Sequence, residues 1–307
     1  MQKNRPSISQ KTLIFCIVSF LITFQVKAQD AMLYPDSLNK TAVKAVAITG
    51  AAIYAGGMFG LYQLWYKDYP QSNFHFINDN AEWLQMDKMG HMTTAYYTSY
   101  LSSEALKLTG LSHRKSDIWG SIAGFGFMTA IEILDGYSAE WGASPGDLIA
   151  NTTGAGLYIG QQLLWGEQRI LLKASYHSTK WPKLNPEQLG ANAFQSIIKD
   201  YNGQTIWVSC NINSFLKSDN FPEWLNIAVG YGAEGMIFAN ESNQEYELTS
   251  EKRYRQFYLS LDIDLNRVKV KSKTLKLILK SIGFIKIPFP TLEYNTKNGL
   301  KGHILYF

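Results

Sequence analysis

The sequence predicts an α+β protein, with an N-terminal bundle of about four largely apolar helices followed by a smaller β-rich C-terminal region. Long apolar segments fill the first half of the chain, and acid, amide and imidazole groups recur inside them. After about residue 200 the segments alternate like strands. The predicted organisation is a signal peptide over 1–28, a helical domain over 29–175, a linker over 176–203 and the β-rich region over 204–307.

The N-terminus has the pattern of a secretory signal peptide. Basic residues precede an apolar run over 12–26, and Val26-Lys27-Ala28 fits a cleavage site. An uncleaved anchor is the alternative. No cysteine follows the run at a lipid-attachment position, so a lipid anchor is not expected. We therefore expect an exported protein, in the periplasm or associated with the outer membrane, and the inner membrane is left open.

The cysteine count limits the possible disulfides and metal sites, and the charge distribution limits the possible partners. Only Cys210 remains after the predicted cleavage, which excludes an internal disulfide and a CxxC-type zinc site. Residues 251–307 hold twelve Lys/Arg and four Asp/Glu, so a basic surface is expected near the C-terminal end. Nucleic acid is a poor partner for an exported protein. The expected partner is membrane lipid or another envelope component, and the oligomeric state is not predicted.

Two helices are predicted before residue 110. Residues 41–65 form a Gly- and Ala-rich apolar stretch that fits either a membrane span or a buried core helix. Residues 66–86 are polar and aromatic and are predicted to be a loop. Residues 87–109 form the second helix, which Gly110 ends.

Two more helices are predicted over 116–135 and 145–171. Ser116 and Asp117 are the expected cap residues of the first of these. Ser144 before Pro145 is typical of a capped N-terminus for the second. The short connections favour a bundle.

The C-terminal region reads as strands interrupted by one helix. Residues 204–212 and 226–238 are rich in β-formers, and 253–265 alternates between apolar and polar residues. About four strands are legible, which is too few for a closed membrane barrel. Residues 273–284 form a basic amphipathic helix, which packs on the sheet or, alternatively, lies on a membrane surface.

Candidate site residues lie on the predicted helices. Asp87 and His91 are four apart and can meet on one face, as a general base, half of a metal site or a structural hydrogen bond. Glu132 follows an apolar run and needs a buried partner, which Lys88 or His91 can supply. His91, Asp87 and Glu132 are the candidate catalytic residues. The wider polar cluster, for ligand binding or structure, contains Lys88, Asp135, Glu140, Asp147, Asn151 and Gly154.

We expect five of these side chains to converge near one end of the bundle: Asp87, His91, Glu132, Asp147 and Asn151. Asp147 also suits the first turn of a helix, where the dipole stabilises an acid. The oxygen and nitrogen ligands available do not select one metal, so metal and cofactor stay unknown. The sequence contains no GxSxG, HExxH, Walker or GxGxxG motif.

The pattern DKxGH, a Glu at a helix end and then EWGASPGDLIANTTGA resembles the YfiM-type family of bacterial envelope lipoproteins, a domain of unknown function, over about residues 80–170. The same skeleton is similar to the VanZ-like membrane family, which is linked to glycopeptide tolerance. That resemblance implies matching positions at Asp87, Lys88, His91, Glu132, Asp147, Asn151 and Gly154. Neither family implies a reaction. Residues 200–307 match neither and look like additions in Bacteroidetes-type envelope proteins.

Two functions follow as expectations. The favoured one is a membrane-associated structural or binding protein of the envelope, because no recognisable nucleophile accompanies the cluster. The alternative is an enzyme or lipid-handling protein acting on a lipid or cell-wall intermediate, with His91 as acid/base or metal ligand. An open cavity beside His91 would favour the alternative, and a dry, fully paired network would favour a structural role.

Overall fold

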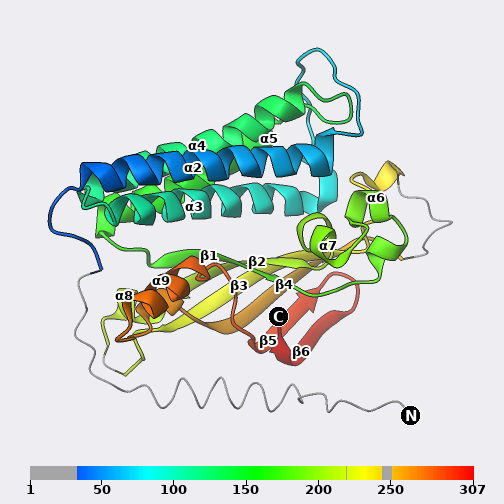
Figure 1. The fold of residues 1–307 in the computed structure, drawn as a ribbon. Coiled ribbons are helices and arrows are strands. Elements are labelled where there is room, and N and C mark those ends of the chain that lie inside the picture. The colour runs from blue at the N-terminus through cyan, green and yellow to red at the C-terminus, as the bar shows by residue number, and fades with distance from the viewer. Residues whose placement is uncertain (1–32, 219, 244–250) are drawn as a thin grey trace, which may run out of the picture.

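The computed structural model describes residues 33–218, 220–243 and 251–307, so the predicted signal peptide lies outside the described residues. A layer of helices packs over a six-stranded antiparallel sheet (Figure 1). The helices come first and the sheet follows, which confirms the predicted α+β class.

The helical layer has four long members: α2 (Lys40–Leu61), α3 (Met86–Lys107), α4 (His113–Gly136) and α5 (Pro145–Trp165). A π-helical turn, η1 (Tyr62–Tyr66), extends α2. Ser144 Oγ caps α5 by accepting from the Asp147 amide at 3.2 Å, as the sequence predicts. Gly120 lets α3 and α4 touch, since a Cβ there would lie 2.5 Å from the Ser103 nitrogen.

The predicted caps of α4 were wrong. The helix begins at His113, so Ser116 and Asp117 lie inside it and are buried. Asp117 instead accepts hydrogen bonds from Ser103 and Tyr158, at 2.6 and 2.7 Å, and pairs with Lys107 at 2.8 Å. The carboxylate therefore ties α4 to α3 and α5 rather than satisfying amides at a helix end.

The strands follow chain order in the sheet: β1 (Ile170–Tyr176), β2 (Gln204–Asn211), β3 (Leu225–Glu234), β4 (Tyr254–Ile263), β5 (Phe289–Asn295) and β6 (Gly299–Tyr306). The fourth predicted helix was too long, because α5 stops at Gly166 (φ 70°) and 170–176 is a strand. Tyr96, Tyr158 and Leu172 form a core between the helices and the sheet.

Short elements connect the strands. The predicted linker, 176–203, contains η3 (Trp181–Lys183), α6 (Pro186–Leu189) and α7 (Ala193–Lys199). The remaining ones are η2 (Glu82–Gln85), α8 (Ile212–Leu216), η4 (Glu241–Asn243), η5 (Leu265–Arg267) and α9 (Lys273–Ser281). Lys280 of α9 pairs with Glu104 of α3 at 2.6 Å, so α9 is tied to the helical layer.

The sheet buries its polar face. On β4, Tyr258 and Asp262 are buried, whereas Phe257 and Leu259 on the other face are 43% and 47% exposed. Asp262 pairs with Lys173 of β1 at 2.8 Å, and both side chains are fully buried. Strands exposed to lipid have this alternation of apolar-outward and polar-inward residues.

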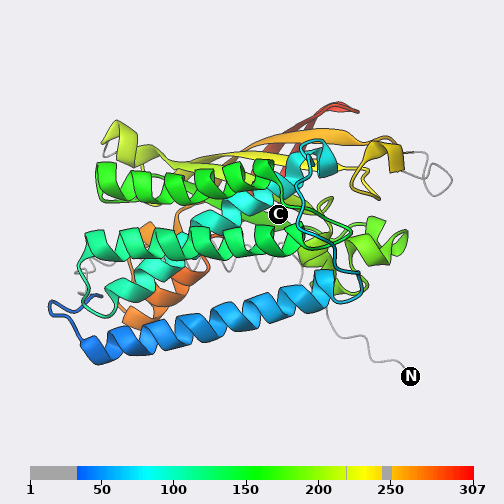
Figure 2. The same ribbon diagram turned by 90° about the horizontal axis from the view of Figure 1, so that it is seen from above.

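Helix α2 lies at the edge of the helical layer (Figure 2) and has no buried residue. Among the described residues, two helical segments are long and apolar enough to cross a membrane, by length and composition only: Lys40–Tyr66 and His113–Gly136.

Candidate functional site

A left-handed turn leads into α3 and places the first site residues. Trp83, Leu84 and Gln85 have φ values of 47°, 49° and 65°, a conformation that side chains rarely adopt. Arg255 of β4 holds this turn by donating to the Leu84 carbonyl at 3.2 Å and to Gln85 Oε1 at 2.7 Å. Such strain persists only where surrounding contacts enforce it, and it is common at functional sites.

Lys88, in the first turn of α3, is surrounded by carboxylates. Its Nζ lies 2.6 Å from Asp79 Oδ2, 2.8 Å from Asp147 Oδ2 and 3.3 Å from Asp87 Oδ2. Burial opposes the charged form, but the three acids outweigh it and raise the pKa of Lys88. The Lys88 ammonium therefore lies where it offsets part of the negative charge of the cluster.

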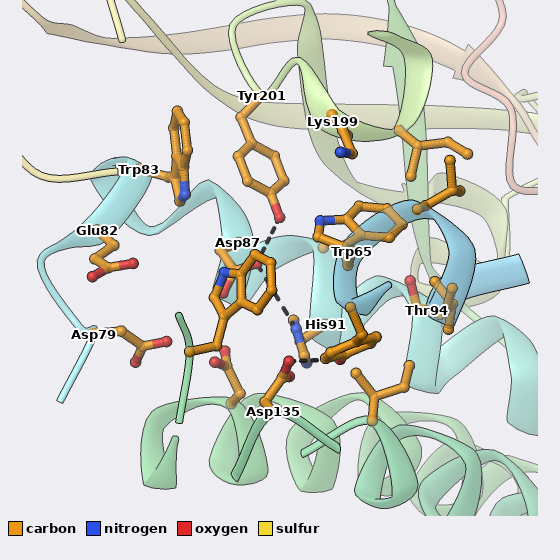
Figure 3. Close-up of a pocket in the computed structure, with 18 of the residues that line it drawn as sticks. Trp65, Asp79, Glu82, Trp83, Asp87, His91, Thr94, Asp135, Lys199 and Tyr201 are labelled. Carbon is orange, nitrogen blue, oxygen red and sulfur yellow. Dashed lines mark hydrogen bonds and ion pairs between the residues drawn. The ribbon is translucent and has the colours of Figure 1, made fainter. Parts of the chain in front are cut away.

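His91 lies one turn further along α3 and has a different partner on each ring nitrogen. Nδ1 is 3.2 Å from Glu132 Oε1 and 3.2 Å from Asn151 Oδ1. Nε2 is 3.8 Å from Asp87 Oδ1 (Figure 3). Burial alone would lower the pKa of His91, but the nearby carboxylates, Asp87 foremost, raise it above its ordinary value.

The structure brings together the five residues expected to converge, and it leaves some of their atoms unsatisfied. Glu132 Oε2 accepts from the Ser144 amide at 3.1 Å. Within the described part of the chain, Asp147 Oδ1 and Asn151 Nδ2 have no hydrogen-bond partner, although the two residues are 4% and 0% exposed. Burial and the Asp87 charge raise the pKa of Asp147 to about 8. The cluster thus holds more carboxylate than its cations balance.

The remaining candidates, Asp135, Glu140 and Gly154, have three different environments. Asp135 accepts from Tyr66 at 2.6 Å; burial, with Glu132 nearby, raises its pKa to about 7. Glu140 is exposed in the turn before α5. Gly154 has a packing role, because a Cβ there would lie 2.0 Å from the Met92 carbonyl oxygen of α3.

Two site residues were missed by sequence reasoning. Tyr201 donates to Asp87 Oδ1 at 2.6 Å from the segment predicted as a linker, and no spacing or motif pointed to it. Asp79 lies in the segment predicted as a loop and accepts from Ser144 Oγ at 2.5 Å. An acid shortly before a helix was the only signal for Asp79.

A cavity of about 670 Å³ opens beside His91. One part of its lining is polar and includes Asp79, Asp87, His91, Asp135 and Asp147. The other part is apolar and comes largely from α2, η1 and α4: Leu61, Leu64, Trp65, Phe127 and Ile131. Figure 3 shows Trp65 and Asp135 on either side of His91. The site is therefore not a dry network, and its lining suits a molecule with an apolar and a polar part.

Comparison with known proteins identifies the region that carries this site. Residues 75–160 match the family described as a predicted periplasmic lipoprotein, a domain of unknown function (DUF2279). The match supports an uncharacterised family of envelope proteins. It is consistent with the expected export to the periplasm or the outer membrane. No curated protein and no solved structure matches the chain. The finer resemblance to YfiM-type and VanZ-like proteins stays a prediction.

Proposed function

We propose that this chain is a membrane-associated binding protein of the cell envelope, and that its cavity takes one lipid-like amphiphile. The observation that carries the proposal is the cavity beside His91, whose lining combines large apolar side chains with acidic ones. Its volume of about 670 Å³ lies within the usual range for ligand sites.

The apolar and the polar residues of the lining would contact different parts of such a ligand. Acyl carbons would contact Leu61, Leu64 and Trp65, where their transfer from water is favourable. The head group would lie near His91 and Asp147, where buried polar atoms lack partners. Such atoms cost free energy until a ligand or water satisfies them.

Membrane association is supported by the apolar surface. Ile48 and Ile53 of α2 are 71% and 70% exposed, and Phe59 is 64% exposed. On the sheet, Val229 and Leu292 are also exposed. Large apolar patches mark interaction surfaces, and for an exported protein a lipid surface is the natural partner.

A structural role for the cluster is the second candidate. The three ion pairs of Lys88 and the tight contact at Gly154 are what a scaffold would need. Catalysis with His91 as acid/base has the required His–carboxylate pair. The structural alternative makes a different prediction from binding when the cavity is filled and the cluster is left intact.

The test fills the cavity from α2. Gly60 lines the cavity and a Cβ there meets nothing within 4 Å, so Gly60→Phe should place a ring inside. Gly56→Phe is the matched control, because Gly56 lies one turn earlier, a Cβ there also meets nothing within 4 Å, and it does not line the cavity. The measurement is the titration of a fluorescent lysophospholipid into the full chain purified in detergent.

We expect one saturable probe site per chain in the wild type and in Gly56→Phe, and at least a tenfold weaker affinity in Gly60→Phe. Equal affinities in all three proteins would place the probe on the outer apolar surface and overturn the proposal. So would a folded wild-type chain that shows no saturable binding.

A further inference from the structure

Three ligating groups meet on the polar side of the cavity. A ring nitrogen of His91 and one carboxylate oxygen each of Asp87 and Asp147 all lie within 4.8 Å of one another. The ligands of a tetrahedral zinc ion are roughly 3.4 Å apart, given bonds of about 2.1 Å. Side-chain rotations that move the ligand atoms by about 1 Å would therefore bring the three groups within bonding distance of one ion.

Lys88 contacts one oxygen of each acid and leaves the second oxygen of Asp147 available, whereas Oδ1 of Asp87 accepts from Tyr201. Lys88 Nζ contacts the Oδ2 atoms of Asp79, Asp87 and Asp147. Oδ1 of Asp147 has no hydrogen-bond partner among the described residues, in a side chain that is 5% exposed and lines the cavity. A buried carboxylate oxygen without a partner costs free energy until a ligand satisfies it.

Glu132 and Asn151 orient the imidazole for this role. Asn151 Oδ1 is a hydrogen-bond partner of Nδ1 at 3.2 Å, and Glu132 Oε1 lies at the same distance without a hydrogen bond. A neutral ring with its proton on Nδ1 would leave Nε2 as the electron-pair donor on the side of Asp87. Histidines that bind metals nearly always donate their other N–H to a carboxylate or carbonyl in this way.

The charge balance points the same way. Asp79, Asp87, Asp147 and Glu132 surround Lys88 and His91 in a largely buried volume. Four carboxylates thus face one lysine and one imidazole. A divalent ion would remove the excess without requiring protons.

We propose that Asp87, His91 and Asp147 bind one divalent transition-metal ion of the zinc or manganese class. The imidazole disfavours calcium and magnesium, which take oxygen ligands. The ion site does not require the amphiphile. With the ion bound, an anionic head group would meet a cation rather than carboxylates, a consequence that does rest on the proposed function.

The test uses the full chain in detergent, treated with a chelator and free of added lipid. Zn²⁺ and Ca²⁺ are titrated by calorimetry into the wild type, His91→Ala and Asp147→Asn, with His113→Ala as the control. His113 is exposed at the start of α4. Circular dichroism checks that each protein is folded. Co²⁺ absorption in the visible range reports the ligand geometry in the wild type.

We expect one Zn²⁺ per wild-type chain, tighter than Ca²⁺, and at least a hundredfold loss in His91→Ala and Asp147→Asn. His113→Ala should bind like the wild type, and Co²⁺ should give the intense bands of a low-coordinate site. A folded wild type that binds no Zn²⁺ overturns the proposal, as does equal Zn²⁺ affinity in all four proteins. Because no lipid is present, either result leaves the amphiphile test independent.

Discussion

His91 Nδ1 lies 3.2 Å from Glu132 Oε1, so a carboxylate of α4 lies against an imidazole on α3. The second oxygen of Glu132 is held by the Ser144 amide at the start of α5. One side chain thus contacts all three site helices, and the other ring nitrogen of His91, Nε2, lies on the side of Asp87.

Glu132→Gln should weaken Zn²⁺ binding by 10- to 100-fold while leaving one site per chain. The amide still fits the space but supports the imidazole less strongly than a carboxylate does. Calorimetry on the chelator-treated chain measures the change. Glu140→Gln is the control, because Glu140 is exposed. Unchanged affinity in Glu132→Gln would show that Glu132 does not support the metal-binding nitrogen.

Gly154→Ala should lower the unfolding free energy by about 1–3 kcal/mol, the usual range for overpacking. The new Cβ would meet the Met92 carbonyl at 2.0 Å, forcing α3 and α5 apart. Gly156→Ala on the same helix meets nothing within 4 Å, so it should be neutral or stabilise by about 0.5–1 kcal/mol. Thermal unfolding of both variants checks this, and similar melting temperatures for the two would be inconsistent with the tight contact.

Asp117→Asn should destabilise the chain by about 3–5 kcal/mol, because it leaves the buried Lys107 without its closest acid. Lysophospholipid affinity in the fraction that stays folded should be unchanged, since Asp117 does not line the cavity. Denaturant unfolding gives the first quantity and the probe titration the second. A stable Asp117→Asn variant would argue that the Lys107–Asp117 pair does not hold the helices together.

The lowered pKa of Lys286 predicts that stability depends on pH in the alkaline range. Burial lowers its pKa to about 8, although Asp262 opposes the shift. In the unfolded chain a lysine titrates near 10.4. Between these values the unfolded chain binds more protons, so the unfolding free energy should rise with pH, by at most about 1.4 kcal/mol per pH unit.

Denaturant unfolding at pH 7.5, 8.5 and 9.5 measures this slope. In Lys286→Met the contribution disappears, so the slope over the same range should flatten relative to the wild type. An identical slope in the two proteins would assign the pH dependence to other groups.

The sequence predicted the fold class because its signals are local. Helical periodicity, the Ser144 cap and the alternation over 253–265 each depend on neighbouring residues. Strand β1 was missed because only four residues, 166–169, separate its apolar run from that of α5. The buried face of the sheet was also not predictable, because the alternation of apolar and polar residues does not say which of the two faces is buried.

The candidate site was predictable where spacing on one helix brought residues together, as for Asp87 and His91. It was not predictable where contacts are distant in sequence. Tyr201 reaches Asp87 across 114 positions, and Arg255 holds the turn at Leu84 across 171. Glu140 was included because it begins a motif, although its side chain faces solvent.

The central claim is that the cluster around His91 is a binding site rather than a scaffold. The most direct measurement is the melting temperature of His91→Gln together with its lysophospholipid affinity. The account predicts a melting temperature within a few degrees of the wild type, because Gln retains a polar group for Glu132, and clearly weakened probe binding. A large fall in melting temperature, with wild-type affinity in the folded fraction, would contradict the claim and make the cluster a scaffold.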